Sequence, residues 1–206
     1  MVLKSNELLI ATSNNGKVKE IKAILSKFDC IIKSLREYNL INLPEENGSN
    51  FTENANIKSI YYGTAYNIAT LADDSGLCID ELNGFPGILS ARFAEEQKGF
   101  DNAMKQIQHL LKLQDKTTST AHFICVLSLR FSNGHIENFT GKVTGDLTFP
   151  PRGNNGFGYD PIFIPSGYST TFAEMNSLEK NKISHRNQAI QALMTFLSSS
   201  KKINFR

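Results

Sequence analysis

A short apolar run, a polar loop and an amphipathic segment follow one another near the start of the chain, and this order constrains the fold most. Leu8-Leu9-Ile10-Ala11 is bounded by turn residues and predicts a buried strand. After Ser13-Asn14-Asn15-Gly16, apolar residues recur at helical spacing from Val18 to Phe28, separated by lysine and glutamate. A strand followed by a helix that covers it is the repeating unit of an α/β fold.

The same alternation continues to the middle of the chain, where a hairpin replaces it. Asn50 and Glu53 resemble a capping box, which predicts a helix that carries apolar residues as far as Ile68. Apolar residues alternate from Ala121 to Leu129 and end at Asn133-Gly134, which is typical of a hairpin. Further strands are predicted at residues 30–32, 70–72, 77–79 and 139–143, helices at 102–113 and 185–197, and an irregular segment at 150–165. The pattern indicates α/β architecture with a mixed sheet, in a single domain that spans residues 1–206.

Composition and charge narrow the class of protein further. Lysine and arginine number 22 and aspartate and glutamate 20, so the formal net charge of +2 gives no strong field toward nucleic acid. Three cysteines without a CxxC spacing argue against a disulfide framework and against structural zinc. The first twelve residues hold too short an apolar run for a signal peptide, and the charges after them exclude a membrane span. We therefore expect a cytoplasmic protein that binds neither nucleic acid nor membrane.

The loop from Thr12 to Lys17 joins the first predicted strand to the first predicted helix and is a candidate phosphate site. Backbone N–H groups and the positive end of the helix dipole favour an anion there, and Lys17 adds a charge. The segment is not a Walker A loop, because Val18 stands where a Ser or Thr would hold magnesium. An ordinary capped connection with a solvated lysine is the alternative.

Asp73-Asp74-Ser75-Gly76 places two adjacent acids after an apolar segment, where open α/β sheets bind ligands. Adjacent carboxylates repel each other, so they favour a hard cation such as Mg²⁺. Glu45 and Glu46, on a predicted loop, are candidates for a further metal ligand. The four residues from Asp73 are equally good turn formers, and the two glutamates are typical of a solvated loop, so both interpretations stay open.

The segment from Gly153 to Pro161 combines glycines, which let backbone approach a ligand closely, with two aromatic residues. Phe157 and Tyr159 suit stacking on a base and equally suit burial in the core. Asp160 precedes a proline, where it also suits the start of a turn.

The segment from Glu179 to Arg186 places Lys180, His185 and Arg186 near the start of the last predicted helix. Arginine suits bidentate contact with phosphate and lysine a point contact, while a solvated helix entry capped by Ser184 is the alternative. Together, the four segments fit a Mg²⁺-bound nucleotide polyphosphate in a cleft.

These segments and others between them resemble the motifs of a known family. The matching motifs are Thr12-Ser13-Asn14-Asn15-Gly16-Lys17 with Glu20, Phe51-Thr52-Glu53-Asn54-Ala55 with Lys58, Ala72-Asp73-Asp74-Ser75-Gly76-Leu77, Pro86-Gly87 with Ser90-Ala91-Arg92, Gly156-Phe157-Gly158-Tyr159-Asp160-Pro161, Thr171-Phe172-Ala173-Glu174, Glu179-Lys180 and Ser184-His185-Arg186. In this order the chain resembles the inosine triphosphate pyrophosphatase family, whose members remove non-standard purine nucleoside triphosphates. The matches run over nearly the whole sequence.

The resemblance implies hydrolysis of ITP, dITP or XTP to the monophosphate and pyrophosphate. It implies a homodimer and a long twisted mixed β-sheet flanked by helices, with two lobes around a central substrate cleft. Asp74 would be the general base and a metal ligand, with Asp73 sharing the base role as an alternative. Glu45 would be the second ligand, with Glu46 the neighbouring choice, for Mg²⁺ or Mn²⁺.

The resemblance also assigns substrate contacts. These fall on Thr12, Ser13, Asn14, Asn15, Gly16, Lys17, Ser75, Phe157, Gly158, Tyr159, Asp160, Lys180, His185 and Arg186. Phe157 would stack on the purine, with donors near its edge that favour a 6-keto oxygen, because the 6-amino group of adenine would leave them unpaired. The rival functions are a pyrophosphatase for modified pyrimidine nucleotides and a non-catalytic nucleotide sensor.

Overall fold

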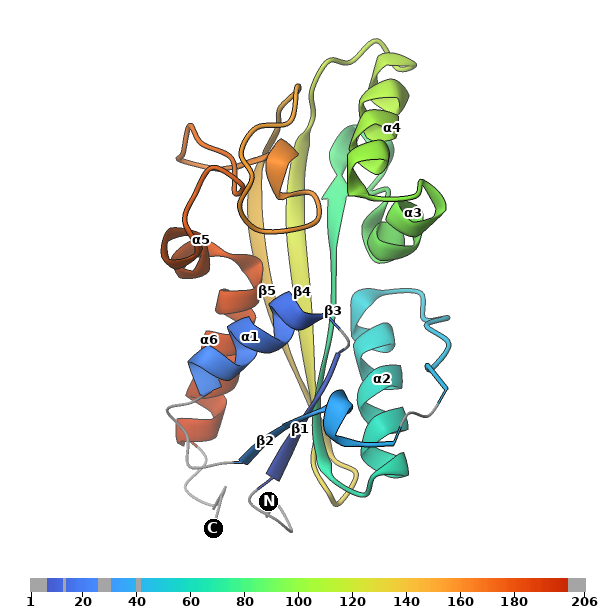
Figure 1. The fold of residues 1–206 in the computed structure, drawn as a ribbon, viewed down its shortest axis with the longest axis vertical. Helices are drawn as coiled ribbons and strands as arrows, with labels where there is room; N and C mark the ends of the chain where they lie inside the picture. The colour runs from blue at the N-terminus through green and yellow to red at the C-terminus, as the bar shows by residue number, and fades with distance from the viewer. Residues whose placement is uncertain (1–6, 13, 26–30, 40–41, 200–206) are drawn as a thin grey trace. The chain divides into compact units, whose positions relative to one another are not determined.

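The computed structural model describes residues 7–12, 14–25, 31–39 and 42–199. Its strands and longer helices are β1 (Glu7–Ala11), α1 (Asn15–Leu25), β2 (Ile31–Ser34), α2 (Phe51–Ala65), β3 (Ala69–Ile79), α3 (Ser90–Glu96), α4 (Phe100–Lys112), β4 (Thr120–Arg130), β5 (Ile136–Leu147), β6 (Phe163–Pro165), α5 (Ser177–Ile183) and α6 (His185–Ser199) (Figure 1). The predicted alternation of strands and helices in the first half, followed by a hairpin, is confirmed.

The strands form one mixed sheet in the order β2-β1-β3-β4-β5-β6. β1 runs parallel to β2 and to β3, with Leu9 opposite Lys33 on one side and Thr70 on the other. β5 and β6 are antiparallel, with Asp146 opposite Ile164. Parallel pairs need a crossover, which α1 and α2 supply, whereas β4 and β5 follow each other directly. The expected α/β class with a mixed sheet is therefore correct.

The chain groups into two compact units, each with its own buried residues. Unit 1 consists of Met1–Asp74, Val126–Thr140 and Ala189–Arg206, and unit 2 of Ser75–Cys125 and Gly141–Gln188. The long strands β3, β4 and β5 contribute residues to both units.

In unit 1, the predicted helix start at Asn50 is confirmed. The Asn50 side chain accepts a hydrogen bond from the Glu53 backbone N–H, while the Glu53 carboxylate accepts from Ser49 at 2.7 Å. The helix ends at Ala65, so Ile68 lies beyond it, contrary to the prediction. Ile68 is nevertheless buried, and it packs with the side chains Leu9, Ala11, Tyr62 and Ala72 in the core.

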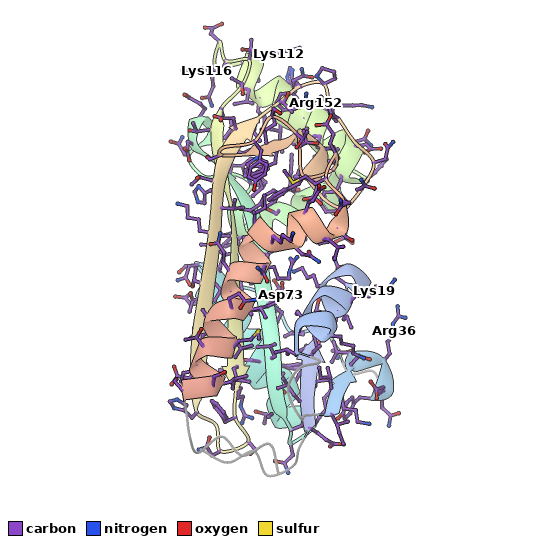
Figure 2. All side chains as sticks on the ribbon, turned by 90° about the vertical axis from the view of Figure 1, so that its left-hand side faces the viewer. Lys19, Arg36, Asp73, Lys112, Lys116 and Arg152 are labelled. Carbon is purple, nitrogen blue, oxygen red and sulfur yellow. The ribbon has the colours of Figure 1, made fainter. Side chains whose placement is uncertain are left out.

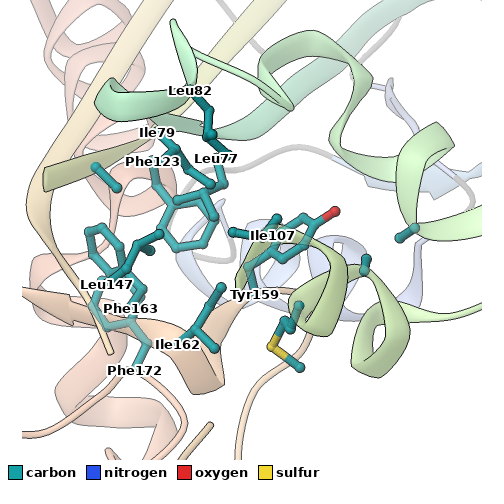
Figure 3. Close-up of a cluster of buried hydrophobic side chains, with 14 of the residues drawn as sticks. Leu77, Ile79, Leu82, Ile107, Phe123, Leu147, Tyr159, Ile162, Phe163 and Phe172 are labelled. Carbon is teal, nitrogen blue, oxygen red and sulfur yellow. The ribbon is translucent and has the colours of Figure 1, made fainter. Parts of the chain in front are cut away.

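In unit 2, aromatic and aliphatic side chains from several elements form a large core (Figure 3). Phe163 and Phe172 are fully buried, with ring centroids 5.2 Å apart, and Phe123 lies 4.8 Å from Phe163. α4 contributes its apolar face through Ile107 and Leu111. The segment 150–165 was predicted to be irregular throughout, but its last three residues form β6 because they pair with β5.

The acidic segment from Asp73 to Gly76 lies inside β3. The two strands predicted at 70–72 and 77–79 are thus one continuous strand, and the turn interpretation of the acids is wrong. β3 lies between β1 and β4, so ladder hydrogen bonds outweigh the local turn preference of Asp, Ser and Gly. Gly76 is required there, because a Cβ would overlap the backbone oxygen of Gly87.

Candidate active site

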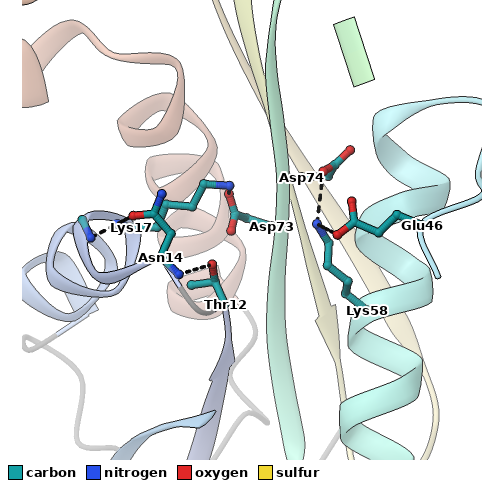
Figure 4. A network of polar contacts seen from close by, with 8 residues as sticks. Thr12, Asn14, Lys17, Glu46, Lys58, Asp73 and Asp74 are labelled. Atoms are coloured by element: carbon teal, nitrogen blue, oxygen red, sulfur yellow. Dashed lines mark hydrogen bonds and ion pairs between the residues drawn. The ribbon is translucent and has the colours of Figure 1, made fainter. Parts of the chain in front are cut away.

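A polar cluster in unit 1 is centred on Asp73 and Asp74 of β3. Lys17, in the first turn of α1, places its ammonium 2.7 Å from the Asp73 carboxylate (Figure 4). The Asp73 side chain is 1% exposed and that of Lys17 is 17% exposed. Lys19, two residues further along α1, is exposed and extends away from Asp73 (Figure 2). Of these two lysines of α1, Lys17 forms the ion pair with Asp73 and Lys19 lies in solvent.

Asp74 has a different partner, supplied by α2. Lys58 lies 3.1 Å from the Asp74 carboxylate and 3.2 Å from that of Glu46. The side chains of Lys58 and Asp74 are 12% and 9% exposed. One ammonium thus serves two carboxylates, which leaves this part of the cluster with an excess of negative charge.

Asp73 and Asp74 are consecutive residues of a strand, so their side chains point to opposite faces of the sheet. Figure 4 shows Asp73 with Lys17 on one side of β3 and Asp74 with Lys58 and Glu46 on the other. The idea that two adjacent carboxylates favour one shared cation is therefore wrong. Each carboxylate instead meets a lysine from a different helix.

Burial raises the pKa of Asp74 above its ordinary value, and the nearby Lys58 ammonium offsets only part of that increase. Burial alone would lower the pKa of Lys58, but the negative charges of Asp74, Asp73 and Glu46 outweigh it, so its pKa is raised. Lys58 is accordingly a fixed positive charge, whereas Asp74 accepts a proton more readily than an exposed aspartate does.

The donor set around Asp74 fits a hard divalent cation. Asp74 Oδ2 is buried and makes no hydrogen bond within the described residues. Mg²⁺ takes oxygen ligands, and the carboxylates here outnumber the ammonium groups. Glu46 is engaged by Lys58, while Glu45 is exposed and its carboxylate has no hydrogen bond or ion pair in the described part of the chain. Among the residues described, no group of three or more His, Cys, Asp or Glu side chains forms a complete metal-binding set.

The Thr12–Lys17 loop is tied locally by its own side chains. Asn14 Oδ1 accepts hydrogen bonds from the backbone N–H of Gly16 at 2.9 Å and of Lys17 at 3.3 Å. The Thr12 hydroxyl accepts from the Asn14 N–H at 3.3 Å. These are the bonds of a capped helix start, so two of the N–H groups at this end of α1 already have a partner. Ser13 and the side chain of Asn15 lie outside the described part of the chain.

A second polar cluster lies in unit 2. It contains an ion pair between two predicted site residues, one basic and one acidic. Lys180 of α5 is 2.6 Å from Asp160, and both side chains are buried. Asp160 also accepts a hydrogen bond from the backbone N–H of Phe157 at 2.9 Å. The Phe157 ring lies 4.6 Å from the Lys180 ammonium and 5.6 Å from the Arg186 guanidinium.

Two further predicted site residues belong to the core of unit 2. Tyr159 is 2% exposed, donates its hydroxyl to the Ser90 carbonyl at 2.9 Å and packs edge-on against Phe100. Burial raises its pKa strongly. His185 stacks on Phe123, with ring centroids 4.9 Å apart, and is buried. Ser184 caps α6 as expected, accepting a hydrogen bond from the N–H of Asn187.

Residues that position Lys58 and the glutamate loop were absent from the predicted site. Asn54 is fully buried and its Oδ1 accepts from the Gly48 N–H at 2.9 Å, which holds the loop that carries the glutamates. Asn56 accepts from Ser128 of β4 at 2.8 Å, and Ser128 lies 2.7 Å from Ser59. The sequence carried a signal for Asn54 and Lys58, which stand in one of the motifs that resemble the known family, and none for Asn56, Ser59 or Ser128.

Comparison with known proteins shows the family of the chain. The model of the Ham1 family matches residues 8–196. The chain belongs to the Ham1 family. Its fold is that of solved Ham1 structures: the Ham1 protein of Staphylococcus aureus has a TM-score of 0.84 at 38% identity and covers 95% of this chain and all of that one. The Ham1 protein of Coxiella burnetii has a TM-score of 0.85 at 36% identity, covering 94% and 99%.

Curated relatives of this Ham1 family member include proteins of named activity. It is 43% identical over 193 residues to a dITP/XTP pyrophosphatase of Zymomonas mobilis. The matched region covers 93% of this chain and 92% of the relative. It is 44% identical to a dITP/XTP pyrophosphatase of Bacillus subtilis, covering 94% and 98%. Within its described residues, no helix is both long and apolar enough to cross a membrane.

Proposed function

We propose that this Ham1 family member hydrolyses non-standard purine nucleoside triphosphates, dITP, ITP and XTP, to the nucleoside monophosphate and pyrophosphate. The observation that carries the proposal is the likeness to dITP/XTP pyrophosphatases at 43–44% identity over more than nine tenths of the chain. Each unit, taken by itself, has a polar cluster whose groups suit one part of such a substrate.

The triphosphate half is assigned to unit 1. Lys17 and Lys58 stand on different helices, and each is held by a carboxylate of β3 at 2.7 and 3.1 Å. Fixed ammonium groups stabilise the charge that develops on phosphoryl oxygens, and they need no reorganisation during the reaction. The start of α1 adds its dipole to the charge of Lys17.

Asp74 is proposed as the general base and, with Glu45, as a ligand of the metal ion. Mg²⁺ or Mn²⁺, when bound, would neutralise phosphate oxygens and lower the pKa of water. Asp74 is suited to accept the proton of the water that attacks phosphorus, because its pKa is raised by burial. The attacking oxygen becomes bonded to the α-phosphorus, and the bond to the leaving pyrophosphate breaks.

The Glu45 assignment has its own test. We expect Glu45→Gln to raise the Mg²⁺ concentration for half-maximal activity more than Glu46→Gln does, because Glu46 is already bound to Lys58. A larger effect of Glu46→Gln would move the metal ligand by one residue.

The base half is assigned to unit 2. Phe157 is proposed to stack on the purine, and Asp160, His185 and Arg186 to stand near its edge. Donors there favour a 6-keto oxygen over a 6-amino group. His185→Ala should then narrow the preference for ITP over ATP, and an unchanged ratio would contradict this assignment.

The test of the reaction is product analysis with dITP, ATP and dUTP, with and without Mg²⁺. Pyrophosphate and dIMP from dITP, dependent on metal and nearly absent with ATP, are expected. Free phosphate would move the cleavage point, and preference for dUTP would favour the pyrimidine rival. Tight binding of dITP without turnover would favour the sensor. We further propose that the protein is a cytoplasmic homodimer. Light scattering of the purified protein tests whether it is a dimer.

A further inference from the structure

The ion pair of Lys180 and Asp160 is buried in unit 2. The two groups are 2.6 Å apart, and their side chains are 6% and 4% exposed. α5 begins with a capping box in which Asn176 and Glu179 exchange hydrogen bonds, which fixes the helix and so the direction of its residues. Lys182, on the same helix, is exposed. The buried position of Lys180 is thus set by the fold and differs from that of its neighbour.

The same carboxylate oxygen of Asp160 holds the loop before it. Asp160 Oδ2 accepts from the Lys180 ammonium and from the backbone N–H of Phe157. Gly156 lies against the pair: a Cβ there would overlap Asp160 Oδ2 and lie 3.4 Å from Lys180 Nζ. Gly156 also has φ of +75°, which a residue with a side chain rarely adopts. The backbone of residues 156–160 is therefore built around the ion pair.

The aromatic ring of Phe157 is oriented by the same ammonium. Lys180 Nζ lies 4.6 Å from the ring centroid, within the range of cation–π attraction. Lys180 thus contacts both the carboxylate that binds the Phe157 N–H and the Phe157 ring itself. Moving this lysine would release the loop at two points.

We propose that Lys180 is a positioning residue for the base-binding loop and makes no contact with the triphosphate. The proposal rests on the function proposed above and changes the role that the family resemblance implies for this residue. The Lys180 side chain is 6% exposed, against 17% for Lys17 and 12% for Lys58, so its ammonium is the least accessible of the three to a phosphate. The effect of Lys180 on the substrate passes through the two groups that its ammonium contacts, the Asp160 carboxylate and the Phe157 ring.

The experiment separates the two halves of the substrate. Calorimetry measures binding of inosine, which has a base and no phosphate, and of tripolyphosphate with Mg²⁺, which has phosphates and no base. For Lys180→Met we expect the affinity for inosine to fall about tenfold, which corresponds to about 1.4 kcal/mol of binding free energy. Affinity for tripolyphosphate should not change. The matched control, Lys182→Met, should alter neither.

Gly156→Ala is the second variant, because it keeps the charge of Lys180 and displaces Asp160 instead. It should reproduce the loss of inosine binding with tripolyphosphate binding retained, and it decides the question if Lys180→Met does not fold. A loss of tripolyphosphate binding in Lys180→Met, with inosine unaffected, would overturn the proposal. So would equal losses of both probes, or no change in either.

Failure of the proposed function has a different signature. Wild-type protein that binds both probes but releases no pyrophosphate from dITP would refute the function and leave the role of Lys180 to be decided by binding. If the wild-type protein hydrolyses dITP and the Lys180→Met variant binds inosine with unchanged affinity, only the positioning role is refuted. Wild-type protein that neither binds inosine nor releases pyrophosphate from dITP would refute both.

Discussion

Lys17→Met should destabilise the protein far more than Asp73→Asn, although both break the same ion pair. At 2.7 Å and an effective dielectric constant of about 20, the Coulomb attraction is about 6 kcal/mol, an upper bound that desolvation of the groups reduces. Lys17→Met removes the ammonium that lies 2.7 Å from the Asp73 carboxylate, which is 1% exposed, and breaking a buried ion pair in this way costs about 3–5 kcal/mol. Since water reaches the 17% exposed Lys17, we expect the lower end, about 3 kcal/mol.

Asp73→Asn has a smaller expected effect because it removes the buried charge itself. The lysine left behind can turn to solvent, so the loss is about 1 kcal/mol, that of a hydrogen bond. The double variant should resemble Asp73→Asn, which gives the two residues a coupling energy of about 3 kcal/mol in magnitude.

Urea unfolding gives the free energy of unfolding for all three variants and for Lys19→Met, an exposed control on the same helix. The midpoint of thermal unfolding should fall by roughly 6–12 °C for Lys17→Met, from about 2–4 °C per kcal/mol at this chain length. The reasoning is refuted if Lys17→Met costs no more than Asp73→Asn, or if Lys19→Met costs as much as Lys17→Met.

Other regions give predictions that simpler measurements check. Phe172→Ala should lower the free energy of unfolding by about 4 kcal/mol in urea titrations, because the ring is fully buried in the core of unit 2. Asn54→Ala should cost about 1–2 kcal/mol and raise the Mg²⁺ concentration for half-maximal activity, because the Gly48 N–H loses its acceptor. Burial lowers the pKa of His122, so this site stabilises the fold fully above about pH 6.5 and less as the pH falls. Titration of its ring by NMR should give a pKa below the ordinary value, and His122→Gln should reduce the loss of stability between about pH 7 and pH 5.

Local pattern was sufficient for most elements. The helix start at Asn50, the amphipathic α4 and the Asn133-Gly134 hairpin were predicted, because a cap, a helical face and a tight turn depend on residues close in sequence. The short α3, α5 and β6 were missed. α5 has only two turns, and β6 exists because its three residues pair with β5, far away in the chain.

The same distinction between local sequence and tertiary contacts holds for the candidate site. Sequence alone singled out the acids of β3, the loop before α1 and the cationic segment of residues 180–186 as candidates for the site. Only the tertiary structure decided their partners. Asp73 and Asp74 are adjacent in sequence, but their place inside a central strand sends them to opposite faces, one to Lys17 and the other to Lys58. Residue type fixes which charge a side chain carries, whereas which charge it meets depends on helices and strands brought together by burial of apolar surface.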